Sequence, residues 1–119
     1  MKEYFRIFIS QPMLNRSNDE IKKEREEAIQ WIKHDLKDFA KDKEIIIIDS
    51  FFENCPHEAQ PLWYLGEAIK LMSEADAVVF LKKWELARGC QIEMQCAVKY
   101  CKQIFIYKED EECQNAKSE

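Results

Sequence analysis

One carboxylate stands where the hydrophobic pattern of the chain calls for an apolar side chain. Helical spacing over residues 89–101 gives one apolar face, made of Cys90, Met94, Ala97, Val98 and Cys101. Glu93 falls on this face, i+3 from Cys90 and i−4 from Ala97. Acidic side chains are rare in protein cores, and buried acids are found preferentially at functional sites. Glu93 is therefore the first candidate for a catalytic group. The alternative is that Glu93 only caps the free amides at the start of its own helix.

The ionisation of Glu93 depends on two opposing effects. The helix dipole favours an anion in the first turn by about 0.3 to 1 kcal/mol. Burial acts against the anion and raises a carboxyl pKa by several units, so an ionised Glu93 needs hydrogen-bond donors or partial access to solvent. Cys90, at the same helix start, is a competing nucleophile. No histidine neighbours Cys90 in the sequence, so we expect it to serve in packing.

Strands and helices alternate along the chain and must position these groups. The apolar runs predict four strands at 4–9, 44–48, 76–81 and 103–107, and the helical patterns predict helices at 17–39, 61–75 and 89–101. Strands separated by helices need crossover connections, which predicts a parallel sheet with helices on both faces. We expect the strand order second, first, third, fourth.

Individual side chains add detail to the first two predicted helices. Ser17 and Glu20 form a capping box, which places the start of the first helix at about Ser17. Arg25 lies in the apolar stripe of that helix and has two interpretations. It either extends to solvent from the edge of the stripe, which we favour, or reaches the end of the sheet. In the second helix, Leu62 is expected to be part of the buried stripe.

Ligands of open parallel sheets bind beyond the carboxyl ends of the strands, where the strand order reverses. Here that point lies between the first and third strands. The loops that meet there supply Ser10, Gln11, Asp49, Ser50, Trp84, Glu85 and Arg88. Polar groups with a few aromatic rings predict a small planar ligand that carries hydroxyls. Alternatively, Asp49 and Asp76 only bond nearby backbone amides, and Trp84 belongs to a subunit interface.

Composition excludes several classes of protein. A length of 119 residues predicts one domain, and a net charge of −5 argues against binding to duplex nucleic acid. Two glycines cannot build a glycine-rich phosphate loop, and five cysteines without a C-x-x-C pair suggest reduced thiols. We expect a soluble, cytoplasmic protein that contacts no membrane and uses no metal and no cofactor. The domain should span residues 1–108, followed by a frayed acidic tail at 109–119.

The motifs, taken in order, resemble the DUF4406 proteins, a branch of the nucleoside 2-deoxyribosyltransferase-like group. The resemblance covers residues 4–107 and rests on the segments 7–13, 24–26, 48–52, 62–66, 75–78 and 84–93, which read IFISQPM, ERE, IDSFF, LWYLG, ADAV and WELARGCQIE. The segment 84–93 is the most specific of them. The resemblance implies a three-layer, flavodoxin-like or Rossmann-like α/β fold.

The resemblance also implies an activity. In characterised enzymes of the group, a Glu on the helix after the third strand attacks C1′ of a deoxyribose, and by position this residue is Glu93. A second base or water then resolves the glycosyl ester, in the manner of a retaining glycosidase. Asp76 resembles the Asp that opens the third strand in this group. Ala68 stands about where those enzymes carry a further Asp, with Glu67 beside it.

The expected roles in the site are hypotheses that combine the residues of these loops with the resemblance. Asp49 and Asp76 would orient the sugar or support Glu93. Ser10, Gln11 and Arg88 would hold the ribose or phosphate, and Phe51 and Trp84 would stack on the base. The expected substrate-binding residues also include Ser50, Glu85 and Gly89. The expected partner is a nucleoside or nucleotide, and the expected assembly is a homodimer or higher homo-oligomer. Three alternatives stay open: a nucleotide-binding module without turnover, an NAD glycohydrolase similar to TIR domains, and an interaction domain.

Overall fold

The computed structural model describes residues 3–50 and 60–107. Its elements are β1 (Tyr4–Ser10), α1 (Asn18–Asp35), α2 (Lys37–Ala40), β2 (Glu44–Ile47), α3 (Pro61–Met72), β3 (Ala77–Phe80), η1 (Trp84–Leu86), α4 (Arg88–Lys99) and β4 (Gln103–Ile106). The predicted alternation of strands and helices is confirmed. The 3₁₀ turn η1 was not expected, because the sequence indicated only an irregular loop there.

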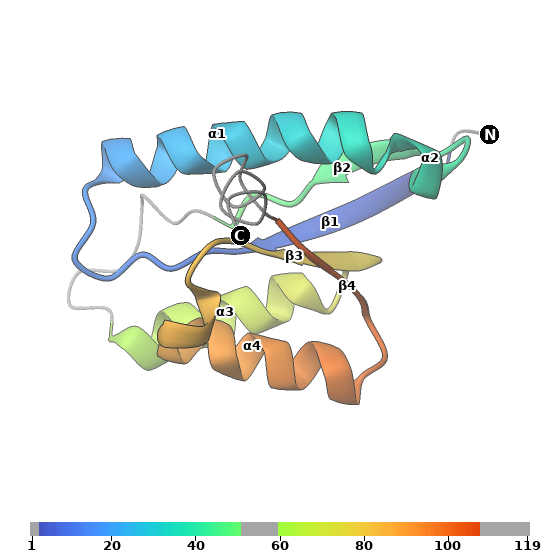
Figure 1. The fold of residues 1–119 in the computed structure, drawn as a ribbon. Helices are drawn as coiled ribbons and strands as arrows, with labels where there is room; N and C mark the ends of the chain where they lie inside the picture. Colours follow the sequence, from blue (N-terminus) through green and yellow to red (C-terminus); the bar gives the residue numbers. More distant parts are fainter. Residues whose placement is uncertain (1–2, 51–59, 108–119) are drawn as a thin grey trace, which may run out of the picture.

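The four strands form one parallel sheet in the order β2-β1-β3-β4, as predicted. Helices α1 and α2 cover one face of the sheet, and α3 and α4 cover the other, which gives three layers (Figure 1). All four strands run in the same direction, so their carboxyl ends share one edge, on the left in Figure 1. Among the described residues, none of the helices is long and apolar enough to cross a membrane.

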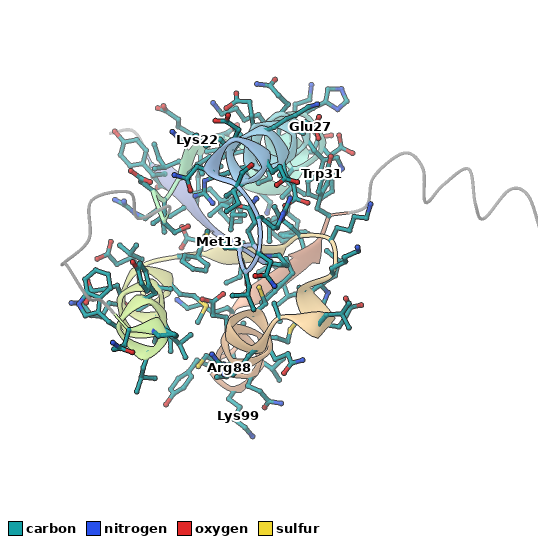
Figure 2. The ribbon with its side chains drawn as sticks, turned by 90° about the vertical axis from the view of Figure 1, so that its left-hand side faces the viewer. Met13, Lys22, Glu27, Trp31, Arg88 and Lys99 are labelled. Carbon is teal, nitrogen blue, oxygen red and sulfur yellow. The ribbon has the colours of Figure 1, made fainter. Side chains whose placement is uncertain are left out.

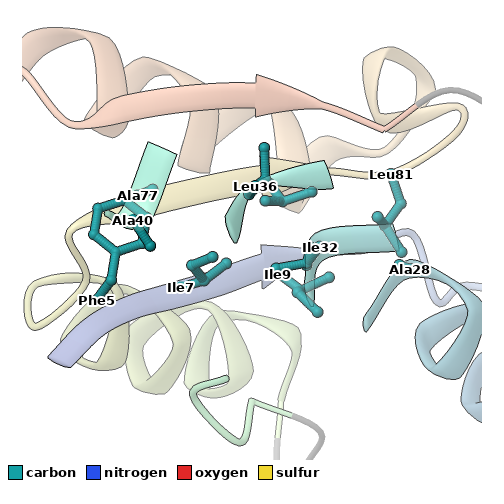
Figure 3. Close-up of a cluster of buried hydrophobic side chains, with 10 residues drawn as sticks. Phe5, Ile7, Ile9, Ala28, Ile32, Leu36, Ala40, Ala77 and Leu81 are labelled. Atoms are coloured by element: carbon teal, nitrogen blue, oxygen red, sulfur yellow. The ribbon is translucent and has the colours of Figure 1, made fainter. Parts of the chain in front are cut away.

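Alternation along β1 sends neighbouring side chains to opposite faces. Phe5, Ile7 and Ile9 pack with α1 in one apolar cluster, which Figure 3 shows. Phe8 belongs to a second cluster with residues of α3, β3 and α4. Ser10 follows the same alternation as Phe8, so its hydroxyl points toward α4 rather than toward α1.

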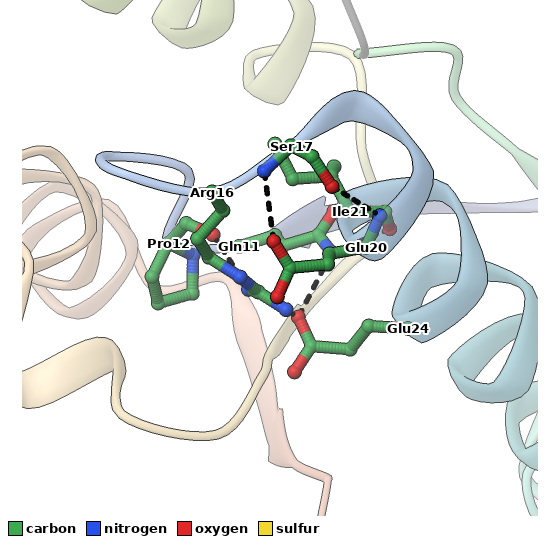
Figure 4. A network of polar contacts seen from close by, with 7 residues as sticks. All are labelled: Gln11, Pro12, Arg16, Ser17, Glu20, Ile21 and Glu24. Atoms are coloured by element: carbon green, nitrogen blue, oxygen red, sulfur yellow. Dashed lines mark hydrogen bonds and ion pairs between the residues drawn. The ribbon is translucent and has the colours of Figure 1, made fainter.

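The start of α1 is fixed as the sequence predicts. The Ser17 hydroxyl accepts a hydrogen bond from the Glu20 amide, and the Glu20 carboxylate accepts one from the Ser17 amide. Both bonds of this capping box are drawn in Figure 4. The capping box therefore fixes the point at which the loop after β1 ends and α1 begins. This loop borders the site described below.

Three expected core residues are wrong, and all lie near helix ends. Leu62, in the first turn of α3, is 76% exposed. Val98, in the last turn of α4, and Cys101, two residues past the end of α4, are also exposed. Strands of four residues span only about 13 Å, whereas helices of twelve residues span about 18 Å. The helix ends consequently extend past the sheet that would bury them.

Arg25 corrects a further expectation. The side chain does not extend to solvent; it is 8% exposed and donates from Nη2 to the Ile48 carbonyl at 3.1 Å and to the Ser50 hydroxyl at 3.1 Å. Arg25 thus reaches the carboxyl end of β2, the alternative that was less favoured. The expected acidic tail at 109–119 lies outside the described residues.

Candidate functional site

A wide cleft opens at the carboxyl edge of the sheet, with a volume of about 1620 Å³. Its wall comes from the end of β1 and the loop after it, from the first turns of α1, α3 and α4, and from the segment 82–87. Figure 2 views this edge, with Met13 between α1 above and Arg88 on α4 below. The cleft lies where the order of the strands reverses, as the sequence predicts.

Glu93 lines this cleft and meets Ser10, which is fully buried behind it and is not itself a lining residue. Glu93 is 8% exposed and shares the buried stripe of α4 with Cys90 and Ala97. The Ser10 hydroxyl donates to Glu93 Oε1 at 2.6 Å. Burial raises the pKa of Glu93 to about 7, and the Ser10 hydrogen bond partly offsets that rise. Glu93 is therefore a carboxyl group that changes charge near neutral pH at the border of a cleft.

Cys90 lies beside this pair but is poorly suited to act as a nucleophile. Burial raises the pKa of the Cys90 thiol to about 11, the hydrogen bond with Ser10 lowers it, and the charges of Glu93 and Glu24 raise it. The thiol thus stays protonated at neutral pH, whereas thiolates are the reactive form. The expectation that Cys90 mainly packs agrees with this environment.

A second polar network holds the loop after β1 against α1 (Figure 4). Gln11 Nε2 donates to the Ile21 carbonyl and to Glu24 Oε1, each at 2.9 Å. Arg16 donates to the same Glu24 oxygen at 2.8 Å and to the Pro12 carbonyl at 2.9 Å. Gln11, Arg16 and Glu24 all line the cleft.

Sequence reasoning missed Glu24 as a member of the site. The signal was present, since Glu24 lies i+3 from buried Ile21 and i−4 from buried Ala28. Glu93 stands in the same relation to Cys90 and Ala97. Two helices on opposite faces of the sheet therefore each place one carboxylate beside the cleft, Glu93 buried and Glu24 partly buried.

Arg25 and Ser50 form the polar border at the end of β2. Ser50 lines the cleft, accepts from Arg25, and donates to the Ile9 carbonyl at 3.4 Å. Burial lowers the pKa of Arg25, and the charge of exposed Asp49 raises it. Arg25 thus ties α1 to β2 and, through Ser50, to β1.

The other expected site residues divide into two groups. Arg88 and Gly89, at the start of α4, line the cleft, and so does Gln11. Trp84 instead packs on Phe80, with ring centroids 5.4 Å apart, and exposed Glu85 is not among the lining residues. Phe51 lies outside the described residues.

Asp76 lies at the opposite edge of the sheet. Its carboxylate accepts from the Arg6 amide at 2.8 Å, and its own amide donates to the Arg6 carbonyl at 2.8 Å. The whole length of β3 separates Asp76 from the end that carries the cleft. This placement matches the alternative in which Asp76 only bonds nearby backbone, and it separates Asp76 from Glu93.

The chemistry open to this arrangement is that of a carboxyl group. Glu93 is ionised above its pKa of about 7 and protonated below it, so it can act as a nucleophile, a base or an acid. Within residues 3–50 and 60–107, no group of three His, Cys, Asp or Glu side chains is placed to hold a metal ion.

Comparison with known proteins gives one match. Neither the search of curated proteins nor that of solved structures finds a match. The family model described as "Domain of unknown function (DUF4406)" matches residues 29–106, a range that contains α4 and Glu93 but begins after Ser10 and Gln11. Because this range is more than half of the chain, the protein belongs to the DUF4406 family.

Proposed function

We propose that this protein binds a nucleoside or nucleotide in the cleft and cleaves its N-glycosidic bond, with Glu93 as the nucleophile. The observation that carries the proposal is the buried Glu93 carboxylate, which lines the cleft and accepts a hydrogen bond from Ser10. The resemblance to nucleoside 2-deoxyribosyltransferase-like enzymes supports the same residue and the same reaction.

The reaction has two steps. An oxygen of ionised Glu93 attacks C1′, a C1′–O bond forms, and the C1′–N bond breaks with its electron pair leaving on the base. The base takes a proton from solvent in the cleft. Water then attacks C1′ of the glycosyl ester, the C1′–O bond to Glu93 breaks, and the water loses a proton to solvent, which leaves the free sugar and restores the carboxylate. The nitrogen of a second base can attack in place of water and loses its proton in the same way. The Ser10 hydroxyl holds Glu93 Oε1 and so orients the carboxylate for attack.

The lining of the cleft suits the parts of such a ligand. Exposed Leu62 and half-buried Met13 and Leu65 offer apolar surface to a base. Arg88 begins α4, so its guanidinium and the free amides of that helix end favour a 5′-phosphate. A deoxynucleoside monophosphate is therefore the first substrate to test.

A second candidate function is nucleotide binding without turnover. Buried Ala68 lines the cleft about where the related enzymes carry an Asp. The adjacent Glu67 pairs with Lys70 at 3.1 Å on the surface of α3 and is not among the residues that line the cleft. Glu67 thus does not replace the missing acid, which favours a site that binds but does not react.

Incubation with the four deoxynucleosides and their monophosphates, followed by chromatography of free base, tests the first function. We expect release by the wild type, a loss of at least a hundredfold in Glu93→Gln, and no change in Glu74→Gln, an exposed Glu far from the cleft. Release at full rate from Glu93→Gln would remove Glu93 from the mechanism.

The same samples distinguish the alternatives. Thermal stabilisation by these ligands without any free base would favour the binding module. Incubation with NAD and detection of nicotinamide would instead favour a TIR-like glycohydrolase.

A further inference from the structure

Glu24 presents one free carboxylate oxygen to the cleft. Both of its hydrogen bonds, from Gln11 Nε2 and from Arg16 Nη1, end on Oε1, and Oε2 has no partner among the described residues (Figure 4). Within those residues, only Gln11 Oε1 and Arg25 Nη1 are side-chain atoms that are both buried and unpartnered, so Glu24 Oε2 keeps accessible surface. The Glu24 side chain is 12% exposed and lines the cleft. A ligand in the cleft can therefore reach this oxygen.

The position of the Glu24 carboxylate is set by donors that are themselves anchored. Gln11 Nε2 also donates to the Ile21 carbonyl, and Arg16 Nη1 also donates to the Pro12 carbonyl. A carboxylate offers about four lone-pair positions, and both donors use the same oxygen. Oε2 is thus held in one place with its capacity to accept hydrogen bonds unused.

Glu24 and Glu93 lie on either side of the end of β1. Ser10 and Gln11 are consecutive, and Ser10 bonds to Glu93 on α4 while Gln11 bonds to Glu24 on α1. The charges of Glu93 and Glu24 both raise the pKa of the Cys90 thiol, so both carboxylates act on the same sulfur. A ligand that lies across the end of β1 therefore meets both of them.

The two walls of the cleft differ in charge. The segment after β3 and the first residue of α4 contribute three exposed cations: Lys82, Lys83 and Arg88. Helix α1 and the loop before it contribute three carboxylates and two cations: Glu20, Glu24, Glu27, Arg16 and Lys23. A phosphate is attracted to the first wall, which leaves the wall of Glu24 for the uncharged part of the ligand.

We propose that Glu24 Oε2 accepts a hydrogen bond from an uncharged O–H or N–H group of the ligand and so determines specificity. This inference rests on the proposed function and deepens it. A phosphate carries only acceptors and negative charge and would be repelled by this oxygen. A deoxynucleotide offers two groups with the required chemistry, the 3′-hydroxyl of the sugar and the exocyclic amino group of the base.

Calorimetry in the Glu93→Gln background, in which turnover is blocked, tests the contact. The probes are the 5′-monophosphates of 2′-deoxyadenosine and 2′-deoxycytidine. The base arm uses their analogues without the exocyclic amino group, and the sugar arm uses their 2′,3′-dideoxy analogues. We expect at least about tenfold weaker binding in one arm, because a hydrogen bond to a charged group is lost.

Glu24→Gln then inverts the contact with little change of shape. Its side-chain oxygen can still accept from Gln11 and Arg16, so its NH₂ group, a donor, takes the place of Oε2. We expect the parent nucleotides to bind at least about tenfold more weakly to this variant, and the difference between parent and analogue to disappear. Glu26→Gln, at an exposed Glu of α1 that does not line the cleft, removes the same charge and should keep both.

The outcomes separate this inference from the proposed function. Binding of the parents with no loss in either arm overturns the role of Glu24 and leaves the chemistry of Glu93 standing. Failure of every probe to bind overturns both. Equal weakening by Glu24→Gln and Glu26→Gln, or discrimination that persists in Glu24→Gln, also overturns the inference. The arms measured with Glu24 intact provide the test even if Glu24→Gln does not fold.

Discussion

Two charged side chains interrupt the apolar stripes of two helices, and they differ in what surrounds them. Arg25 on α1 and Glu93 on α4 are each 8% exposed. Arg25 donates to the end of β2 and is not among the residues that line the cleft, whereas Glu93 lines it. Burial alone therefore does not identify a reacting group. Arg25 holds the sheet edge together, and the chemistry proposed above is that of Glu93.

The pH dependence of stability gives the largest expected difference between the two groups. The pKa of Glu93 is about 7 in the folded protein and 4.5 in the unfolded reference, so the proton is held more tightly by the folded state. This contribution is present in full below pH 4.5, is lost as the pH rises, and is gone above about pH 7. It is on the order of 3 kcal/mol.

Urea unfolding from pH 4.5 to 9 measures this contribution. The free energy of unfolding should fall with pH in the wild type and in Glu74→Gln, and the fall should largely disappear in Glu93→Gln. An identical pH profile in Glu93→Gln would show that Glu93 ionises like an exposed acid.

Arg25→Met should lower the free energy of unfolding by about 2 kcal/mol, because the Ile48 carbonyl and the Ser50 hydroxyl lose a buried donor. Urea unfolding at pH 7 measures the loss. The matched variant Arg88→Met, at an exposed arginine, should change stability by less than about 0.5 kcal/mol. Equal effects of the two variants would contradict the structural role given to Arg25.

The sequence was sufficient for the fold and for the position of Glu93. Apolar runs and helical spacing are local signals, so they predict the alternation of strands and helices and place Glu93 in the buried stripe of α4. The expected strand order of the parallel sheet is also the observed one. The contact of Ser10 with Glu93 joins residues 83 positions apart and depends on which face of β1 packs on α4. That face is decided by the packing of the whole sheet.

The expectations that failed depended on tertiary geometry. Helical spacing cannot show where a helix extends beyond the sheet, so Leu62 was placed in the core. Asp76 was expected in the site because of the resemblance, although it opens the third strand and so lies at the edge of the sheet opposite to the cleft. Arg25 was assigned to the surface because a burial site for its charge is not visible in a local pattern.

Ser10→Ala gives the smallest expected change in the free energy of unfolding. It tests how the surroundings of Glu93 set its pKa, which is where Glu93 differs from Arg25. The Ser10 hydrogen bond lowers the pKa of Glu93, so its removal should raise that pKa above about 7. A hydrogen bond to a carboxylate is stronger than one to a neutral acid, so the destabilisation should be about 1 kcal/mol larger at pH 9 than at pH 5.

Ser73→Ala is the matched control, because its hydroxyl donates to the Lys70 carbonyl at an exposed site. Its effect should not depend on pH. A pH-independent loss in Ser10→Ala as well would mean that Ser10 contributes only packing.

The most direct test of the account is a carbon-13 NMR titration of the Glu93 side-chain carboxyl, assigned by its absence in Glu93→Gln. We predict a midpoint near pH 7 and a shift of that resonance when a deoxynucleoside monophosphate is added. A midpoint near 4.5, together with a resonance that no nucleotide perturbs, would contradict the placement of Glu93 at the border of a binding cleft.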